Sequence, residues 1–150
     1  MISHGPSGPW WGRDRDRIIF ERGANDTARS LVNEQNRTGR IYKCQLDVLG
    51  YETRIVNIMF RRKHPNLAVV SVDGPTSSKH RFPDGSLCMW HPWDPRCNRW
   101  IVADGLRELL LLVAIHLFKE AWWREFGEWL GPEVEHASSK DVMATEREFA

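Results

Sequence analysis

Apolar residues recur at helical spacing in the first part of the chain. Residues 13–22 (RDRDRIIFER) combine alternating charges with an apolar patch, and Asn25 or Asp26 could cap a second helical stretch over Thr27 to Asn36. This pattern predicts one interrupted helix or two short helices ahead of the rest of the domain.

Three runs with strand-like patterns follow. In Ile41 to Leu49, apolar and polar side chains alternate, which is the period of a strand with one buried face. Residues 52–60 and 67–72 form the second and third runs. The spacers are too short for a parallel crossover, so we expect an antiparallel meander. Cys44 lies on the apolar side of the first run and is expected in the core.

A long amphipathic helix is predicted over residues 104–126. Asp104 can cap it, Gly127 can end it, and one broad apolar stripe runs along it. At about 1.5 Å per residue it is long enough to cross a whole sheet face. The order of elements predicts an α+β fold, a single domain in which an antiparallel meander packs against helices.

The ends of the chain differ from its middle in composition. Residues 1–12 are rich in Gly and Pro and predict a flexible N-terminal arm whose Trp10 and Trp11 could dock elsewhere. Residues 13–136 form the predicted domain, and 137–150 a polar C-terminal tail. A length of 150 residues suits one domain of this kind.

Charge and cysteine content exclude several classes of function. Lys and Arg number 21 against 20 Asp and Glu, so the basic excess that nucleic-acid and membrane-surface binders need is missing. The longest apolar run, 109–115, is far shorter than the ~20 residues of a bilayer span. Three cysteines and no apolar leader predict a cytoplasmic protein with free thiols.

The aperiodic segment Thr76 to Trp100 holds the candidate chemistry. A loop of this length inside a domain is usually functional. Cys88 follows a glycine-containing turn, with His80, Arg81 and His91 close by in sequence. Nearby cations favour the thiolate, so we expect a lowered pKa for the Cys88 thiol. This makes Cys88 the expected most reactive thiol, ahead of Cys97 and well ahead of Cys44.

A family resemblance rests on five residues of this segment. His80, Gly85, Leu87, Cys88 and Trp100 stand in the order of the active-site motif of ubiquitin-conjugating enzymes, and the resemblance covers about residues 26 to 126. It implies the ubiquitin-conjugating-enzyme fold and a protein carboxyl group carried as a thioester on Cys88. It also implies that His80 holds the loop.

The sequence departs from the family pattern after the histidine. The family has His-Pro-Asn, whose Asn is credited with stabilising the oxyanion, whereas here Arg81 and Phe82 follow His80. A literal His-Pro-Asn at His64 to Asn66 lies 24 residues before Cys88, in a predicted turn between strands, and is treated as a decoy. Oxyanion stabilisation is therefore expected from backbone N–H groups beside Cys88 or from a loop indole.

Altered spacings and a terminal Trp-x-Gly-Pro-Glu-x-x-His, Trp129 to His136, look more like the standalone bacterial conjugating enzymes of CBASS antiphage operons. That resemblance implies that the acyl donor is the C-terminus of a cyclic-oligonucleotide synthase of the CD-NTase type, or a ubiquitin-like protein, with an activating enzyme as a further candidate partner. Asp94 could orient an incoming lysine, and His136 could fold back towards Cys88. The candidate catalytic set is Cys88, His80, His91, Asp94 and His136, with no cofactor and no metal.

Other interpretations remain open at this point. The chain could be an inactive conjugating-fold scaffold that only binds a partner, which the missing Asn favours. His80, Cys88, His91 and Cys97 could instead hold zinc in an interaction module, although the usual paired short spacings are absent. His91 could equally be a plain loop residue, and His116 is interpreted as a satisfied core histidine.

Overall fold

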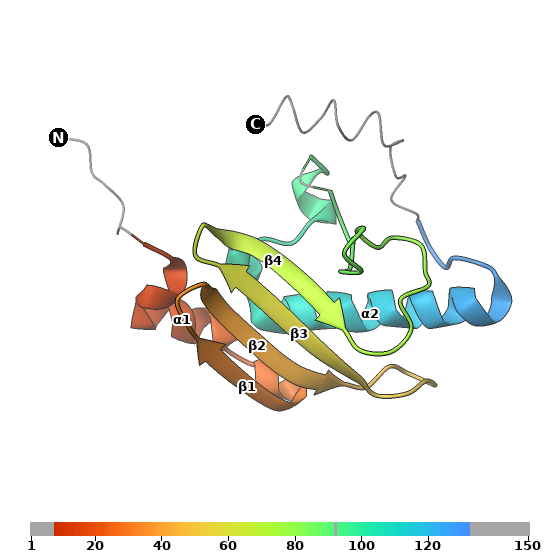
Figure 1. Cartoon of the computed structure of the whole chain (residues 1–150), viewed down its shortest axis with the longest axis horizontal. Coiled ribbons are helices and arrows are strands. Elements are labelled where there is room, and N and C mark those ends of the chain that lie inside the picture. The colour runs from red at the N-terminus through yellow and green to blue at the C-terminus, as the bar shows by residue number, and fades with distance from the viewer. Residues whose placement is uncertain (1–7, 92, 133–150) are drawn as a thin grey trace.

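Four antiparallel strands form one sheet, in which neighbours in space are also neighbours in the chain (Figure 1). The computed structural model describes residues 8–91 and 93–132. The strands are β1 (Arg29–Gln35), β2 (Gly39–Leu46), β3 (Arg54–Arg61) and β4 (His64–Val72). The predicted meander is confirmed in β2, β3 and β4, which pair antiparallel throughout. The mixed helix–sheet class and the single domain are also confirmed.

Strand β1 corrects the helix predicted over Thr27 to Asn36. The segment pairs antiparallel with β2, with an irregularity between Arg29 and Val32, and Ser30 adopts a φ of 54°. The apolar residues at helical spacing were misleading because β1 is an edge strand and nearly all its side chains are exposed. The backbone of β2 needs hydrogen-bond partners on this side, and that requirement outweighs local preference.

The His-Pro-Asn sequence also lies differently from the prediction. His64 opens β4, and Arg61 pairs with it across a two-residue connection, so His64 to Asn66 belong to a strand and not to a turn. The carbonyl oxygen of Pro65 accepts a hydrogen bond of 2.7 Å from Nε1 of Trp10. This contact joins the start of the chain to the edge strand β4.

Two helices accompany the sheet, α1 (Asp14–Glu21) and α2 (Gly105–Phe126). Helix α2 confirms the predicted long helix, and Gly127 ends it with a left-handed φ of 73°. Asp104 precedes α2 as predicted, but its side chain does not cap that helix. Its carboxylate instead accepts a hydrogen bond from the N–H of Ile101, at the start of a short 3-10 turn, η4 (Val102–Asp104). Among the described helices, none is both long and apolar enough to cross a bilayer.

The core lies between the sheet and α2, which covers one sheet face (Figure 1). The alternation in β2 holds, with Tyr42, Cys44 and Leu46 buried. Burying one leucine side chain contributes about 1.5–3 kcal/mol, so the row of fully buried leucines on α2 holds that helix firmly to the sheet. Those leucines are Leu106, Leu109, Leu110 and Leu117.

Trp10 and Trp11 of the predicted N-terminal arm dock on the domain, as the sequence suggested. Both lie in a 3-10 turn, η1 (Trp10–Gly12), and are buried in the core, Trp11 to 1% exposure. Trp10 packs on Phe20 of α1 with ring centres 4.2 Å apart. The ordered domain therefore starts before residue 13. Residues 1–7 of the predicted arm and the predicted tail 137–150 lie outside the described residues.

Candidate functional site

The first part of the long loop folds into a small hairpin, residues 80–88. Arg81 and Leu87 form an isolated antiparallel bridge. Inside it, Phe82 N donates to Ser86 O and Gly85 N donates to Phe82 O, each at 2.8 Å. The turn uses Gly85 at a φ of 88°, which a residue without a Cβ adopts at low cost. The sequence Pro-Asp-Gly-Ser thus forms a tight turn that returns the chain towards the sheet.

The base of this hairpin fixes the position of Cys88. Leu87 N donates to the carbonyl oxygen of Val70 in β4 at 2.9 Å, and Cys88 N donates to His80 O at 2.8 Å. His80 reaches this position with a left-handed φ of 60°. The backbone of His80 therefore holds Cys88 in place, in line with the loop-holding role that the resemblance implies for this histidine.

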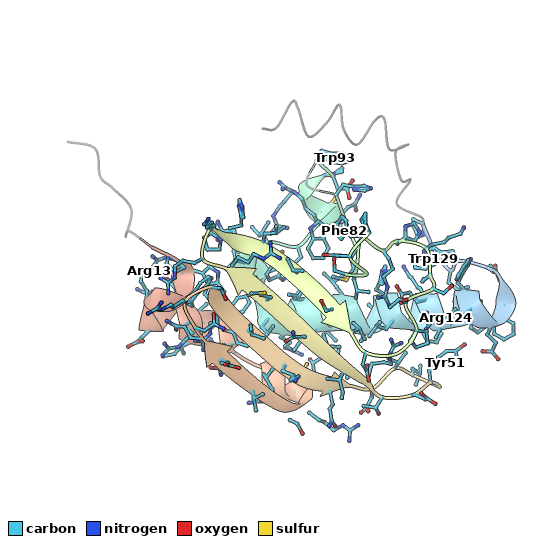
Figure 2. The ribbon with its side chains drawn as sticks, viewed as in Figure 1. Arg13, Tyr51, Phe82, Trp93, Arg124 and Trp129 are labelled. Carbon is cyan, nitrogen blue, oxygen red and sulfur yellow. The ribbon has the colours of Figure 1, made fainter. Side chains whose placement is uncertain are left out.

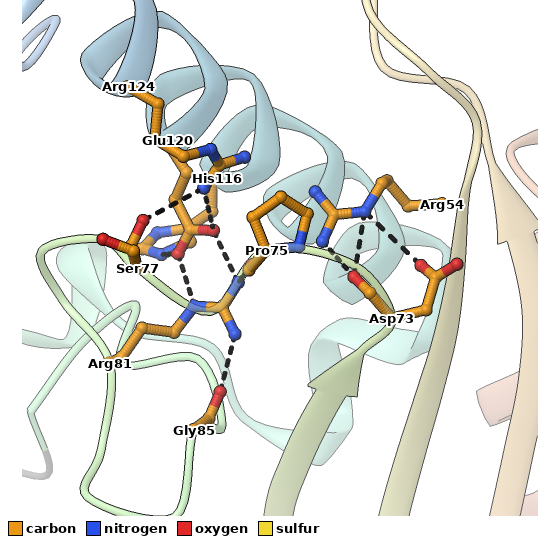
Figure 3. Close-up of polar contacts among 9 residues, drawn as sticks. All are labelled: Arg54, Asp73, Pro75, Ser77, Arg81, Gly85, His116, Glu120 and Arg124. Carbon is orange, nitrogen blue, oxygen red and sulfur yellow. Dashed lines mark hydrogen bonds and ion pairs between the residues drawn. The ribbon is translucent and has the colours of Figure 1, made fainter.

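A buried ion pair attaches the hairpin to α2 (Figure 3). The Arg81 guanidinium binds both carboxylate oxygens of Glu120, with Nε 2.7 Å from Oε2 and Nη2 2.6 Å from Oε1. The side chains are 5% and 0% exposed. Nη1 of Arg81 also donates to Gly85 O at 2.6 Å. One arginine thus ties the hairpin turn and the helix together.

Two further basic side chains lie against Glu120. His116 Nε2 lies 3.2 Å from Oε2, and Arg124 Nη1 lies 3.6 Å from Oε1. Burial alone would raise the pKa of this carboxyl, but hydrogen bonds from Arg81 and His116 and their charges outweigh it and lower the pKa to about 2. Glu120 therefore remains an anion that holds three side chains at one point on α2.

Cys88 lines a cavity of about 520 Å³ between the loop, α2 and the segment after it. We refer to it as the Cys88 cavity. Its volume lies within the ~300–1,000 Å³ typical of ligand pockets. It brings two of the predicted catalytic residues, Cys88 and His80, together with other side chains of the loop, of α2 and of the segment after it. The residues on its wall that matter below are Asn98, Trp100, Leu112, His116, Lys119 and Trp129, with the second thiol of Cys97.

The pKa of the Cys88 thiol is raised, whereas the sequence predicted that it would be lowered. The side chain is buried, 2% exposed, and burial together with the negative charge of Asp94 raises the pKa of the thiol to about 11. At pH 7, only about one Cys88 in ten thousand is then a thiolate. The expected lowering of this pKa was wrong because the Arg81 guanidinium points to Glu120.

The other two cysteines lie in different settings. Cys44 is buried in β2, as predicted, and burial raises the pKa of its thiol to about 11. Cys97 is exposed in the 3-10 turn η3 (Arg96–Asn98), with Sγ 3.6 Å from Oδ1 of Asn98. Since Cys97 is the exposed thiol, the predicted order of reactivity does not fit the resting structure.

His91 and Asp94 form a local turn. His91 N donates to Asp94 Oδ2 at 2.7 Å, and Asp94 N donates to His91 O at 3.0 Å. The His91 ring stacks on Trp93, with ring centres 4.6 Å apart and planes 4° apart. His91 is buried and is not part of the cavity wall. This arrangement supports the plain-loop interpretation of His91, while a lysine-orienting role for Asp94 stays a prediction.

Trp129, just after α2 (Figure 2), lines the Cys88 cavity. Its ring centre lies 4.4 Å from His80 and 5.5 Å from His116. His116 was expected in the core and not at the site, although its spacing of four from Glu120 places both residues on one helix face. His136, the last residue of the terminal motif, lies outside the described residues.

Two of the N–H groups expected to stabilise an oxyanion already donate hydrogen bonds within the protein. The N–H of Cys88 already donates to His80, and Nε1 of Trp100 donates to Gly105 O at 2.9 Å. The side-chain amide of Asn98 lies on the cavity wall. An amide N–H can donate a hydrogen bond to an oxyanion, so Asn98 offers a group of this type on the cavity wall.

The zinc arrangement is not formed in the described part of the chain. Across residues 8–91 and 93–132, no three His, Cys, Asp or Glu side chains come together in a way that could hold a metal ion. The four residues of the zinc hypothesis are therefore not gathered at one point.

Comparison with protein-family models, with curated protein sequences and with solved structures gives no match. The function of the Cys88 cavity has to be inferred from the residues that line it.

Proposed function

We propose that the protein is an acyl carrier of the ubiquitin-conjugating type, in which Cys88 binds a protein C-terminal carboxyl group as a thioester and passes it to an amine. The observation that supports this most is the position of Cys88. The motif cysteine lines a ligand-sized cavity, and a hydrogen-bonded hairpin and a buried ion pair fix it there.

The reaction needs two exchanges at one carbonyl carbon. The thiolate of Cys88 attacks the thioester of an activated donor, a new C–S bond forms, and the donor's thiolate leaves. An amine then attacks the Cys88 thioester, the C–S bond breaks, and an amide forms while the amine loses a proton. Each exchange passes through an oxyanion, which the amide of Asn98 could stabilise.

The walls of the cavity suit an extended protein tail. Trp100 and Leu112 offer apolar surface, and Lys119 offers a positive charge. In line with the resemblance, the donor is the C-terminus of a cyclic-oligonucleotide synthase or a ubiquitin-like protein, delivered by an activating enzyme. A chain end is narrow enough to enter a cavity that a folded domain could not enter.

The resting site needs activation before transfer. A thiol with a pKa near 11 is a slow nucleophile at neutral pH, and each unit by which a partner lowers the pKa increases the thiolate fraction about tenfold. A cation from the donor or the activating enzyme could do this by offsetting the charge of Asp94.

A second candidate is a binding scaffold that forms no thioester. The observation that favours it is the same burial and raised pKa of Cys88. In that case the cavity binds the tail of the partner without covalent chemistry.

A non-reducing gel separates the two candidates. The protein is incubated with the synthase, the activating enzyme and ATP. The carrier function predicts an adduct that a thiol such as dithiothreitol removes, and that is absent in Cys88→Ala but retained in the core control Cys44→Ala. Co-purification of the partner without any covalent adduct in the wild type would favour the scaffold.

A further inference from the structure

Two thiols line the Cys88 cavity, and they differ in access. Cys88 is 2% exposed, whereas Cys97 is exposed at the surface in η3. The third cysteine, Cys44, lies in β2 and is not part of the cavity wall. The cavity is therefore bounded by one thiol that a large partner can reach and one that it cannot.

Cys97 is held at its place on the wall. Nη2 of Arg96, the preceding residue, lies 2.7 Å from the carboxylate of Asp104 ahead of α2, and Nη1 donates to Arg99 O at 3.1 Å. These contacts attach the turn η3 to the start of the helix. The turn that carries Cys97 is thus positioned from two sides.

We propose that Cys97 accepts the acyl group first and relays it to Cys88, a step that rests on the acyl-carrier function proposed above. A donor protein presents its thioester at the surface, where Cys97 is exposed. Cys88 is only 2% exposed, so a thioester presented at the surface meets Cys97 before it meets Cys88.

The relay is an ordinary thiol–thioester exchange. The thiolate of Cys97 attacks the donor's carbonyl carbon, and the donor's thiolate leaves. The thiolate of Cys88 then attacks the same carbon, the bond to the sulfur of Cys97 breaks, and Cys97 leaves as a thiolate that takes up the proton released by Cys88. No oxidant or reductant is consumed.

Cys97 would serve for loading the acyl group, and Cys88 for holding it. An exposed thioester is open to water and to small thiols, whereas a thioester on Cys88, which is 2% exposed, should react with both more slowly while the protein is folded. The relay therefore allows a surface encounter with the donor and a long-lived adduct inside the cavity.

A synthetic probe tests the relay without a protein partner. A short peptide carrying a C-terminal 2-mercaptoethanesulfonate thioester is mixed with the wild type, Cys97→Ala, Cys97→Ser, Cys88→Ala and the control Cys44→Ala. Samples are quenched in acid at increasing times, digested with pepsin and mapped by mass spectrometry. Circular dichroism checks that each variant is folded.

In the wild type, the acyl group should be found first on Cys97 and later on Cys88. It should remain on Cys97 in Cys88→Ala, and loading of Cys88 should slow at least tenfold in both Cys97 variants. Transfer from Cys97 to Cys88 should also rise about tenfold per pH unit between pH 7 and 9, as the thiolate fraction of Cys88 does.

Two results would overturn the relay and leave the carrier function standing. In the first, Cys88 is loaded in Cys97→Ala at the same rate as in the wild type. In the second, no acyl group is found on Cys97 in Cys88→Ala. An acyl group that stays on Cys97 in the wild type and never reaches Cys88, or no acylation of either thiol in any sample, would contradict both the relay and the carrier function.

Discussion

The guanidinium of Arg81 and the carboxylate of Glu120, 39 residues apart in the chain, form a two-pronged ion pair with both side chains buried. Arg81 stands directly after His80, at the start of the hairpin that positions Cys88. Its charge anchors this hairpin to α2 (Figure 3) and is not among the causes that shift the pKa of the Cys88 thiol. The pair thus helps to fix the position of Cys88, while the weak acidity of its thiol comes from burial and from the charge of Asp94.

Replacing Arg81 with Met should strongly destabilise the fold. The substitution leaves Glu120 buried with its main partner removed, and breaking a buried pair in this way typically costs about 3–5 kcal/mol. Urea denaturation followed by circular dichroism measures the free energy of unfolding. The matched control is Arg17→Gln, which removes a more exposed pair with Asp14 and should cost less than about 1 kcal/mol. A loss below 1 kcal/mol in Arg81→Met would show that the pair does not anchor the hairpin.

Stability should fall in acid because of Glu120. Its pKa is lowered in the folded state from an ordinary 4.5 to about 2, so its contribution is fully present above about pH 4.5 and is lost as the pH falls towards 2. The contribution corresponds to about 3 kcal/mol. The measurement is the difference in unfolding free energy between the wild type and Glu120→Gln from pH 7 to pH 2. That difference should shrink below pH 4.5; a constant difference would contradict the lowered pKa.

Cysteine labelling should follow exposure. Limiting iodoacetamide at pH 7 should modify Cys97 first, then Cys88, which lines the cavity, and last Cys44, which lies in the core. Since the pKa values of both buried thiols are raised to about 11, their labelling should accelerate about tenfold per pH unit up to that range. Peptide mass spectrometry gives the rates. Fastest labelling of Cys88 at pH 7 would mean that its thiol is more acidic than its burial implies.

Asn98 should matter for acyl transfer and not for folding. If its amide stabilises the oxyanion, Asn98→Asp should slow transfer to an amine roughly 100-fold, the usual effect of losing one such donor. The side chain is exposed, so the melting temperature should be unchanged. The control is Asn66→Asp in the His-Pro-Asn sequence of β4, which should transfer normally. Equal rates for the two variants would remove Asn98 from the site.

The sequence predicted those parts of the fold in which burial alternates along the chain. Tyr42, Cys44 and Leu46 alternate with partly or fully exposed neighbours, and the short connections required antiparallel pairing. Strand β1 was missed because an exposed edge strand such as Arg29–Gln35 has no apolar alternation to detect. Its existence depends on the backbone of β2, which a local pattern cannot reveal.

The sequence pointed to two residues of the Cys88 cavity but not to the electrostatics around them. The loop motif pointed to Cys88 and His80, and both line the same cavity. The direction of the Arg81 side chain depends on Glu120, and sequence proximity to Cys88 gave the wrong partner. The i, i+4 spacing of His116 and Glu120 was a signal that could have placed this helix face at the site.

The chemistry of the adduct on residue 88 tests the carrier function most directly. Cys88→Ser keeps the geometry but forms an oxyester, which resists thiols because an alkoxide is a poorer leaving group than a thiolate. With the synthase, the activating enzyme and ATP, the wild type should yield an adduct that dithiothreitol cleaves, and Cys88→Ser a more slowly formed adduct that survives it. Fragment mass spectrometry should locate both on residue 88. An adduct that persists unchanged in Cys88→Ala, or one that maps to another residue in the wild type, would contradict the role of Cys88 as the acyl carrier.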